Sequence, residues 1–129
     1  MHKTFGIIAA VYGALAVMLG AFGAHALKDK LDAYQHTIYE KAVHYQFYHV
    51  AALLAVAFLA EKLHTRSLTL SGWFFSAGIL FFSGSLYLLA TRNLLGTDAL
   101  TPVLGPVTPL GGLCFIIGWV LLAISFTKL

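Results

Sequence analysis

The chain has 129 residues, of which 60% are hydrophobic and only 10% are charged, with 8 basic and 5 acidic side chains. A soluble domain usually carries about a quarter charged residues, so these few charges could not cover the apolar surface of a soluble fold. The composition excludes a disordered chain, a typical soluble enzyme and a nucleic-acid-binding module, and it indicates one integral membrane domain.

Four continuously apolar segments are long enough to cross a bilayer, whose hydrocarbon core needs roughly 20 helical residues. They cover about 4–27, 42–60, 68–90 and 110–127. The first run is too long for the core of a signal peptide, so we expect it to remain as a span. Apolar runs without alternation favour helices over barrel strands. The sequence therefore predicts an all-α membrane protein, an antiparallel four-helix transmembrane bundle that forms a single domain over 1–129.

Residues 28–41 differ from the rest, because they carry three of the five acids and three of the eight basic residues. Leu31, Tyr34, Ile38 and Tyr39 recur near helical spacing, which gives one apolar and aromatic face. This pattern predicts an amphipathic interfacial helix before the second span. The alternative is a polar loop with a frayed helix start.

The connection at 91–109 holds all three prolines of the chain, so we expect a long loop there. Basic residues divide evenly between the two expected sides of the membrane, four on each. Glu61 is the only acid on the side of the termini, and this weakly favours termini in the cytoplasm of a cell-membrane protein.

Small residues recur along the first span at intervals of seven, which creates a seam that allows close backbone approach to another helix. The fourth span repeats this pattern. The expected helix-packing residues are Gly6, Ala9, Gly13, Ala16, Gly20, Gly23, Gly111 and Gly118. The seam could serve packing within the chain or a contact between copies. Packing within the chain is favoured, because it must be satisfied first.

Polar residues gather in the leaflet shared by the end of span one, the start of span two, the end of span three and the start of span four. Polar groups at membrane depth are costly, so we expect them to face the bundle interior and pair. We hypothesise a hydrogen-bonded cluster of His25, Gln46 and His49, reached by a serine of span three. The candidate polar-cluster or ligand residues are His25, Gln46, His49, Ser83, Ser85, Arg92 and Thr108.

Three interpretations of this cluster remain open. The favoured one is a structural clamp between helices. A metal or haem site is a second, since neutral imidazole is a good ligand, and a proton- or substrate-binding cavity is a third. His36, Glu40 and His44 also align at i, i+4 and i+8, which suits an interfacial metal or, more simply, a solvated helix face. We expect no catalytic residue, no metal and no cofactor.

Arg92 and Thr108 suggest a further possibility, an anion site at headgroup level. Arg92 follows span three, and Thr108 precedes Pro109 at the expected start of span four, where backbone N–H groups would be free. An anionic headgroup or small anion would find donors there. The alternative is that Arg92 extends to the interface and Thr108 caps a helix.

Several motifs together resemble a known family. They are GAFGAH at 20–25, KAVHYQFYH at 41–49, FSGSLY at 82–87, TPLGG at 108–112 and the pair Gly118-Trp119. They are similar to those of a small bacterial membrane-protein family of unknown function, domain of unknown function 423, which includes membrane-stabilising protein A. The resemblance covers nearly the whole chain, although the 91–109 connection looks expanded. It implies no established biochemical activity, and an envelope role for one member implies support of membrane integrity.

The expected function is therefore that of a non-enzymatic integral membrane protein that supports the envelope by binding lipid in its polar half. Membrane lipids are the expected partners, with a second copy of the chain as a further candidate and no nucleic acid. The alternative is a small oligomeric transporter or channel for an ion or metabolite, and a haem- or metal-binding membrane protein is third.

Overall fold

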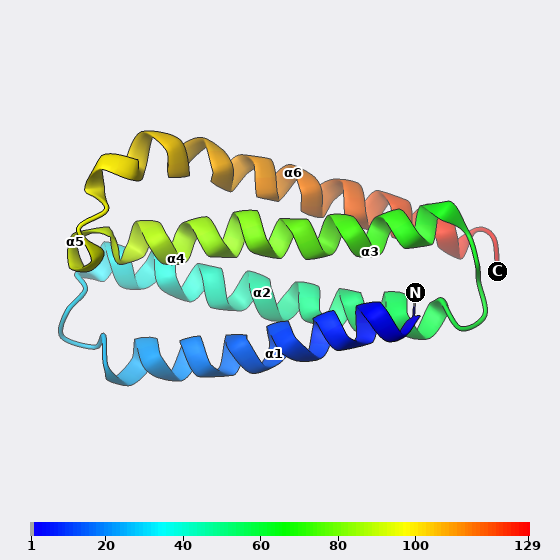
Figure 1. The fold of residues 1–129 in the computed structure, drawn as a ribbon, viewed down its shortest axis with the longest axis horizontal. Coiled ribbons are helices and arrows are strands. Elements are labelled where there is room, and N and C mark those ends of the chain that lie inside the picture. The colour runs from blue at the N-terminus through cyan, green and yellow to red at the C-terminus, as the bar shows by residue number, and fades with distance from the viewer. Residues whose placement is uncertain (1) are drawn as a thin grey trace.

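The computed structural model describes residues 2–129, which form helices joined by short connections (Figure 1). Three of the four apolar helices are α1 (His2–His25), α2 (Ala33–Leu59) and α6 (Thr101–Phe126). The remaining one consists of α3 (Arg66–Gly78), a π-helical turn η1 (Ile79–Ser83) and α4 (Gly84–Ala90). The short elements α5 (Arg92–Leu95) and η2 (Asp98–Leu100) lead into α6. The four apolar helices, with α3, η1 and α4 counted as one, are long and apolar enough to cross a membrane. This confirms the predicted all-α fold with four spans.

The helices lie side by side in chain order, and the chain reverses direction at each connection (Figure 1). Contacts between α2 and the third span show this reversal in residue numbers. The Gln35 side chain donates to Asn93, Ser83 donates to the Ala42 carbonyl, and the His49 ring packs against Phe75. The residue numbers thus rise along α2 while those of its partners fall. Both termini consequently lie toward the same end of the molecule.

Helix α2 begins earlier than the apolar pattern indicates, because residues 33–41 of the segment predicted as an interfacial helix form its first turns, while an interfacial position for them stays a prediction. Asp32 caps the helix, because its carboxylate accepts from the Gln35 N–H at 2.8 Å and the Gln35 side chain accepts from the Asp32 N–H at 3.1 Å. No glycine or proline follows before Leu59, so nothing interrupts the helix. At 1.5 Å per residue its 27 residues span about 40 Å, more than the roughly 30 Å hydrocarbon core. The helix is therefore longer than a hydrocarbon core is thick.

Helix α6 also begins earlier than expected, so the predicted long loop at 91–109 is largely helical. Pro102 lies in the first turn, where a missing N–H costs nothing, and Pro106 and Pro109 lie inside the helix. Interior prolines are tolerated in membrane helices where other groups satisfy the freed backbone. The hydroxyl of Thr108 donates to the Leu104 carbonyl at 3.3 Å in this region.

The small residues of α1 face α2. A Cβ at Gly13 would lie 3.6 Å from Val50, and one at Gly20 would lie 3.5 Å from Val43. At Gly23 the ring of Tyr39 already occupies the space that a Cβ would need. The seam thus packs within the chain, where Ala9, Ala16 and Gly23 are buried and Gly6, Gly13 and Gly20 are half-buried.

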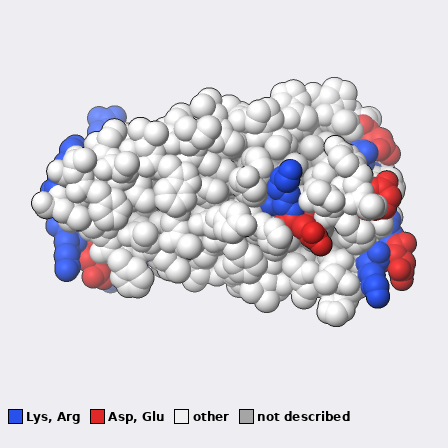
Figure 2. Space-filling model, turned by 180° about the vertical axis from the view of Figure 1, so that it is seen from behind, with Lys and Arg blue, Asp and Glu red and all other residues white. Residues whose placement is uncertain are grey.

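Apolar surface surrounds the molecule between its two ends. Figure 2 shows acidic and basic side chains gathered mainly toward the ends, with a small patch of both signs set further in. Large apolar side chains are exposed on both α1 and α6, including Ile7, Val17, Leu113, Ile116 and Val120. This exposure would be unfavourable in water and is what a lipid-facing helix requires.

Candidate functional site

Gln46 is the centre of a polar network that joins α1, α2, α3 and α4. Its side chain is 3% exposed, and its Nε2 donates to the carbonyl of Tyr12 on α1 at 2.7 Å. Its Oε1 accepts from the hydroxyl of Tyr87 on α4 at 2.7 Å. The hydroxyl of Tyr12 continues the network to the carbonyl of Ser76 on α3 at 3.0 Å. One amide therefore connects α1, α2 and α4 directly.

Tyr39 extends the network toward the connection between α1 and α2. Its hydroxyl donates to the Leu19 carbonyl at 2.5 Å, and its ring meets that of Tyr87 edge to face at 5.2 Å. The ring fits against α1 because residue 23 is glycine. Burial of this ring and its hydroxyl bond both depend on that close approach.

His49 holds α2 against α6. Its Nδ1 lies 2.7 Å from the Tyr45 carbonyl, and because a carbonyl can only accept, Nδ1 carries the hydrogen. Nε2 then accepts from the indole N–H of Trp119 at 3.1 Å. The ring also stacks on Phe115 with centroids 3.5 Å apart and planes 7° apart. Both ring nitrogens are used, so the imidazole is neutral and has no lone pair left for a metal or haem.

The serines at the predicted positions also bond within the chain. Ser83 donates to the Ala42 carbonyl at 2.7 Å, which joins η1 to α2. The Ser85 hydroxyl lies 2.6 Å from that of Thr108, which joins α4 to α6. These hydroxyls act as links between helices.

The predicted cluster of His25, Gln46 and His49 does not form, and this is a correction. His25 is exposed at the end of α1. It lies two residues beyond Gly23, about 200° around the helix from the face that packs on Tyr39. Gln46 and His49 are both buried, but they bond to different partners.

The predicted anion site at Arg92 and Thr108 does not form either. Arg92 donates to the Leu89 carbonyl at 2.6 Å and lies 3.6 Å from the carboxylate of Asp98. Thr108 lies in the interior of α6, because that helix begins at Thr101, so the free N–H groups expected beside Thr108 are absent. Both side chains serve the local structure.

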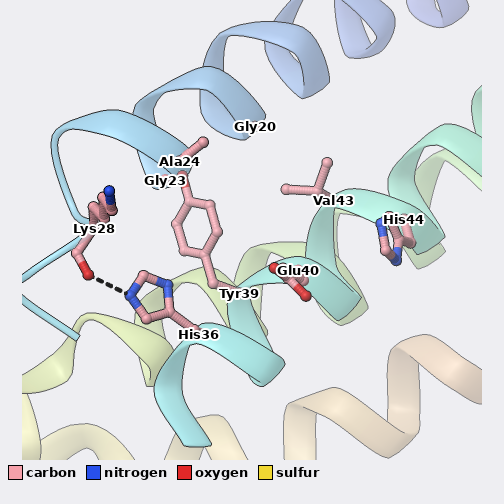
Figure 3. Close-up of a pocket in the computed structure, with 9 residues that line it drawn as sticks. All are labelled: Gly20, Gly23, Ala24, Lys28, His36, Tyr39, Glu40, Val43 and His44. Atoms are coloured by element: carbon pink, nitrogen blue, oxygen red, sulfur yellow. Dashed lines mark hydrogen bonds between the residues drawn. The ribbon is translucent and has the colours of Figure 1, made fainter. Parts of the chain in front are cut away.

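A polar crevice opens between the end of α1 and the first turns of α2, with a volume of about 330 Å³ (Figure 3). Gly20, Gly23, Ala24, Tyr39 and Val43 form its walls, and Lys28, His36, Glu40 and His44 contribute polar side chains. The sequence signalled this region through the charged composition of 28–41 and through the spacing i, i+4, i+8 of His36, Glu40 and His44. Among residues 2–129, no three His, Cys, Asp or Glu side chains come close enough to hold a metal ion.

Almost every buried polar side-chain atom in the described chain, residues 2–129, has a hydrogen-bond partner. The exception is the hydroxyl of Thr97, which lies in the connection between α5 and η2. Within the four spans, each buried polar side-chain atom thus has at least one hydrogen-bond partner in the chain itself. The hydrogen bonds that Tyr12, Tyr39, Tyr87 and Trp119 donate were not predicted from the sequence.

Comparison with known proteins gives the following similarities. Residues 19–112 match the family model described as "Protein of unknown function (DUF423)". UPF0382 membrane protein YwdK of Bacillus subtilis (strain 168) is 42% identical over 127 residues, which covers 98% of each chain. A UPF0382 membrane protein of Staphylococcus epidermidis is 43% identical over 128 residues, covering 98% of this chain and 97% of the relative. No solved structure matches the chain significantly.

Proposed function

The chain belongs to the DUF423 family, whose relatives carry the name of membrane proteins, and on that premise we propose a non-enzymatic role in supporting the integrity of the cell membrane. In this proposal the four spans form a rigid unit, with both termini in the cytoplasm. The unit binds phospholipid headgroups in the leaflet where α1 and α2 are connected.

One observation carries the proposal. The polar groups buried in the described spans are paired with one another, including both nitrogens of His49 and both ends of the Gln46 amide. A transport pathway or a catalytic centre needs polar atoms that a substrate can reach. A fully paired network favours a structural role, because each bond adds rigidity while offering nothing to a ligand.

The free energy of the individual hydrogen bonds is compatible with a structural role. A hydrogen bond between membrane helices contributes about 0.6 kcal/mol on average, so no single bond holds the bundle. Bonds of Tyr39, Gln46, Ser83, Tyr87 and Ser85 nevertheless link every consecutive pair of spans, and the bond from Trp119 links the fourth span to the second. Together they favour one arrangement of the helices over others.

Lipid contact is assigned to the α1–α2 end because the polar crevice lies there. The first turns of α2 extend beyond the hydrocarbon core, so Glu40 and His44 lie near the level of the headgroups. Polar side chains at this depth can bind headgroups without the cost of entering the apolar core.

The test is complementation of cells that lack the gene, with entry of a membrane-impermeant dye after osmotic shock as the measurement. The wild-type protein should restore low dye entry, and the double variant Lys28→Gln/Glu40→Gln should not. The matched control is Lys62→Gln/Glu61→Gln, which makes the same changes at the opposite end and should restore it. Full restoration by the crevice variant, at equal protein level, would contradict the proposed function.

A further inference from the structure

The crevice between α1 and α2 has exposed charged side chains of both signs, Lys28 and Glu40. Within residues 2–129 the only ion pair is that of Arg92 with Asp98. The crevice residues Lys28 and Glu40 thus have no charged partner within 4.0 Å, and neither charged group makes a hydrogen bond among the described residues. In the view of Figure 3 they lie on opposite sides of the Tyr39 ring. An ammonium and a carboxylate held apart at a hollow are complementary to a ligand that itself carries both charges.

We propose that this crevice binds the headgroup of a phospholipid that carries a primary amine, with the phosphate at Lys28 and the ammonium at Glu40. The assignment rests on the proposed function, since it specifies which lipid that function uses. The volume of about 330 Å³ lies at the lower end of the range for ligand pockets, which suits a small headgroup.

The position of the crevice favours a lipid over a soluble molecule of the same chemistry. Its walls include Gly20 and Ala24 from the last turns of α1 and Val43 from the apolar part of α2. Glu40 lies directly before that apolar part, so the crevice connects the hydrocarbon region with the headgroup region. A lipid could place its headgroup in the crevice while its acyl chains remain beside the apolar helix surfaces.

The rim is fixed in place by a hydrogen bond. The Nε2 of His36 lies 2.9 Å from the Lys28 carbonyl, and since a carbonyl only accepts, Nε2 donates (Figure 3). This bond joins α2 to the connection that carries Lys28. The backbone at Lys28 is therefore held beside the crevice before any ligand binds, which reduces the ordering cost of binding.

Charge balance distinguishes an amine-bearing headgroup from the common alternatives. Residues 28–41 carry three acids and three basic residues, so they offer no net attraction to an anionic lipid. A choline headgroup has no N–H to donate to Glu40, and it is best bound by a cage of aromatic rings. Tyr39 is the one aromatic side chain in the crevice, and its hydroxyl is already bonded to Leu19.

The experiment measures which lipids the full-length protein retains. The protein is reconstituted into nanodiscs with equal parts of dioleoyl phosphatidylethanolamine, phosphatidylcholine and phosphatidylglycerol. It is then released into mild detergent, and the retained lipids are counted by native mass spectrometry. We expect the ethanolamine lipid to be enriched over the choline lipid by about two- to fivefold, the range that a partly exposed ion pair supplies.

Variants at Glu40 make the assignment specific. Glu40→Gln should bring the enrichment close to one, whereas the control Glu61→Gln, at the other end of the molecule, should keep the wild-type value. Glu40→Lys should shift the preference to the phosphatidylglycerol lipid, a gain that loss of folding cannot produce. Free phosphoethanolamine at the same concentration should not displace the retained lipid.

The outcomes separate this assignment from the broader proposal. Retention without preference for the ethanolamine lipid, an unchanged preference in Glu40→Gln, or displacement by free phosphoethanolamine would overturn the assignment alone. A wild-type protein that retains no phospholipid would overturn the proposed function as well.

Discussion

At the scale of single residues, the buried polar side chains of this protein act as connectors. Gln46 reaches a carbonyl on α1 and a hydroxyl on α4 from one position on α2. Each buried group has a partner of the matching kind, which is why so many polar residues can be kept at membrane depth.

Replacing Gln46 with leucine should therefore destabilise the bundle. The variant keeps a side chain of similar size but removes the bond to the Tyr12 carbonyl, which keeps its bond within α1, and leaves the Tyr87 hydroxyl without a partner, at an expected cost of about 1–3 kcal/mol. Tyr87→Phe removes only one bond and should cost less. Unfolding in detergent, followed by circular dichroism, gives the comparison, and equal stability of Gln46→Leu and wild type would contradict the network.

His49 gives a prediction about the position of a single hydrogen. The bonds to Tyr45 and Trp119 require a neutral ring with its hydrogen on Nδ1. Nitrogen-15 chemical shifts of the labelled histidine in lipid bilayers distinguish this tautomer from the other and from the cation. In Trp119→Phe, Nε2 loses its donor, so its shift should change while that of Nδ1 stays nearly constant. A wild-type ring with its hydrogen on Nε2 would contradict the bonds of His49 to Tyr45 and Trp119.

Sequence patterns gave the depth of these residues but not their partners. The cost of polar groups in lipid correctly indicated that Gln46, His49 and Ser83 are buried. The same reasoning failed for His25, because depth says nothing about which way a helix face is turned. Tyrosine and tryptophan also look like apolar packing residues in a sequence, so Tyr12 and Trp119 gave no signal that they donate hydrogen bonds.

At the scale of helices, glycines set how closely the elements approach. A Cβ at Gly111 would overlap the backbone of Phe82 in the π-helical turn, and a backbone cannot rotate away as a side chain can. A Cβ at Gly84, by contrast, would meet nothing within 4 Å. The two glycines lie on neighbouring spans, and the space available for a Cβ distinguishes them.

Gly111→Ala should destabilise the protein by about 1–3 kcal/mol through overpacking. Gly84→Ala is the matched control and should be neutral or more stable by about 0.5–1 kcal/mol, because alanine loses less backbone entropy in a helix. Thermal unfolding of both variants in the same detergent measures the difference. A tolerated Gly111→Ala would mean that α6 does not approach η1 so closely.

Helix bounds were harder to predict than the helices themselves. Hydropathy follows the bilayer, so it located the apolar parts of α2 and α6 and missed the turns that extend beyond them. Local signals marked both true starts, namely Asp32 with Gln35 three residues later, and Pro102 in a first turn. The π-helical turn η1 has no comparable signature in the sequence.

At the scale of the whole molecule, polar contacts with a ligand and polar contacts within the chain occupy different places. The network of Gln46, His49 and their partners lies between the helices, where it is closed by the chain itself. The crevice with Lys28 and Glu40 lies at the end of α1, where polar groups remain available. This separation supports a protein whose spans form a scaffold and whose contact with lipid is made at the interface.

Hydrogen exchange of the Gln46 side-chain amide, in a protein reconstituted into lipid bilayers, tests this account most directly. Measured by NMR after transfer to deuterated water, the Nε2 hydrogens should exchange far more slowly than the side-chain amide of the exposed residue Asn93, because the Gln46 amide is enclosed between α1, α2 and α4. Exchange of both amides at the same rate would reveal a water-filled passage between the helices, which contradicts a closed structural network and favours the transporter.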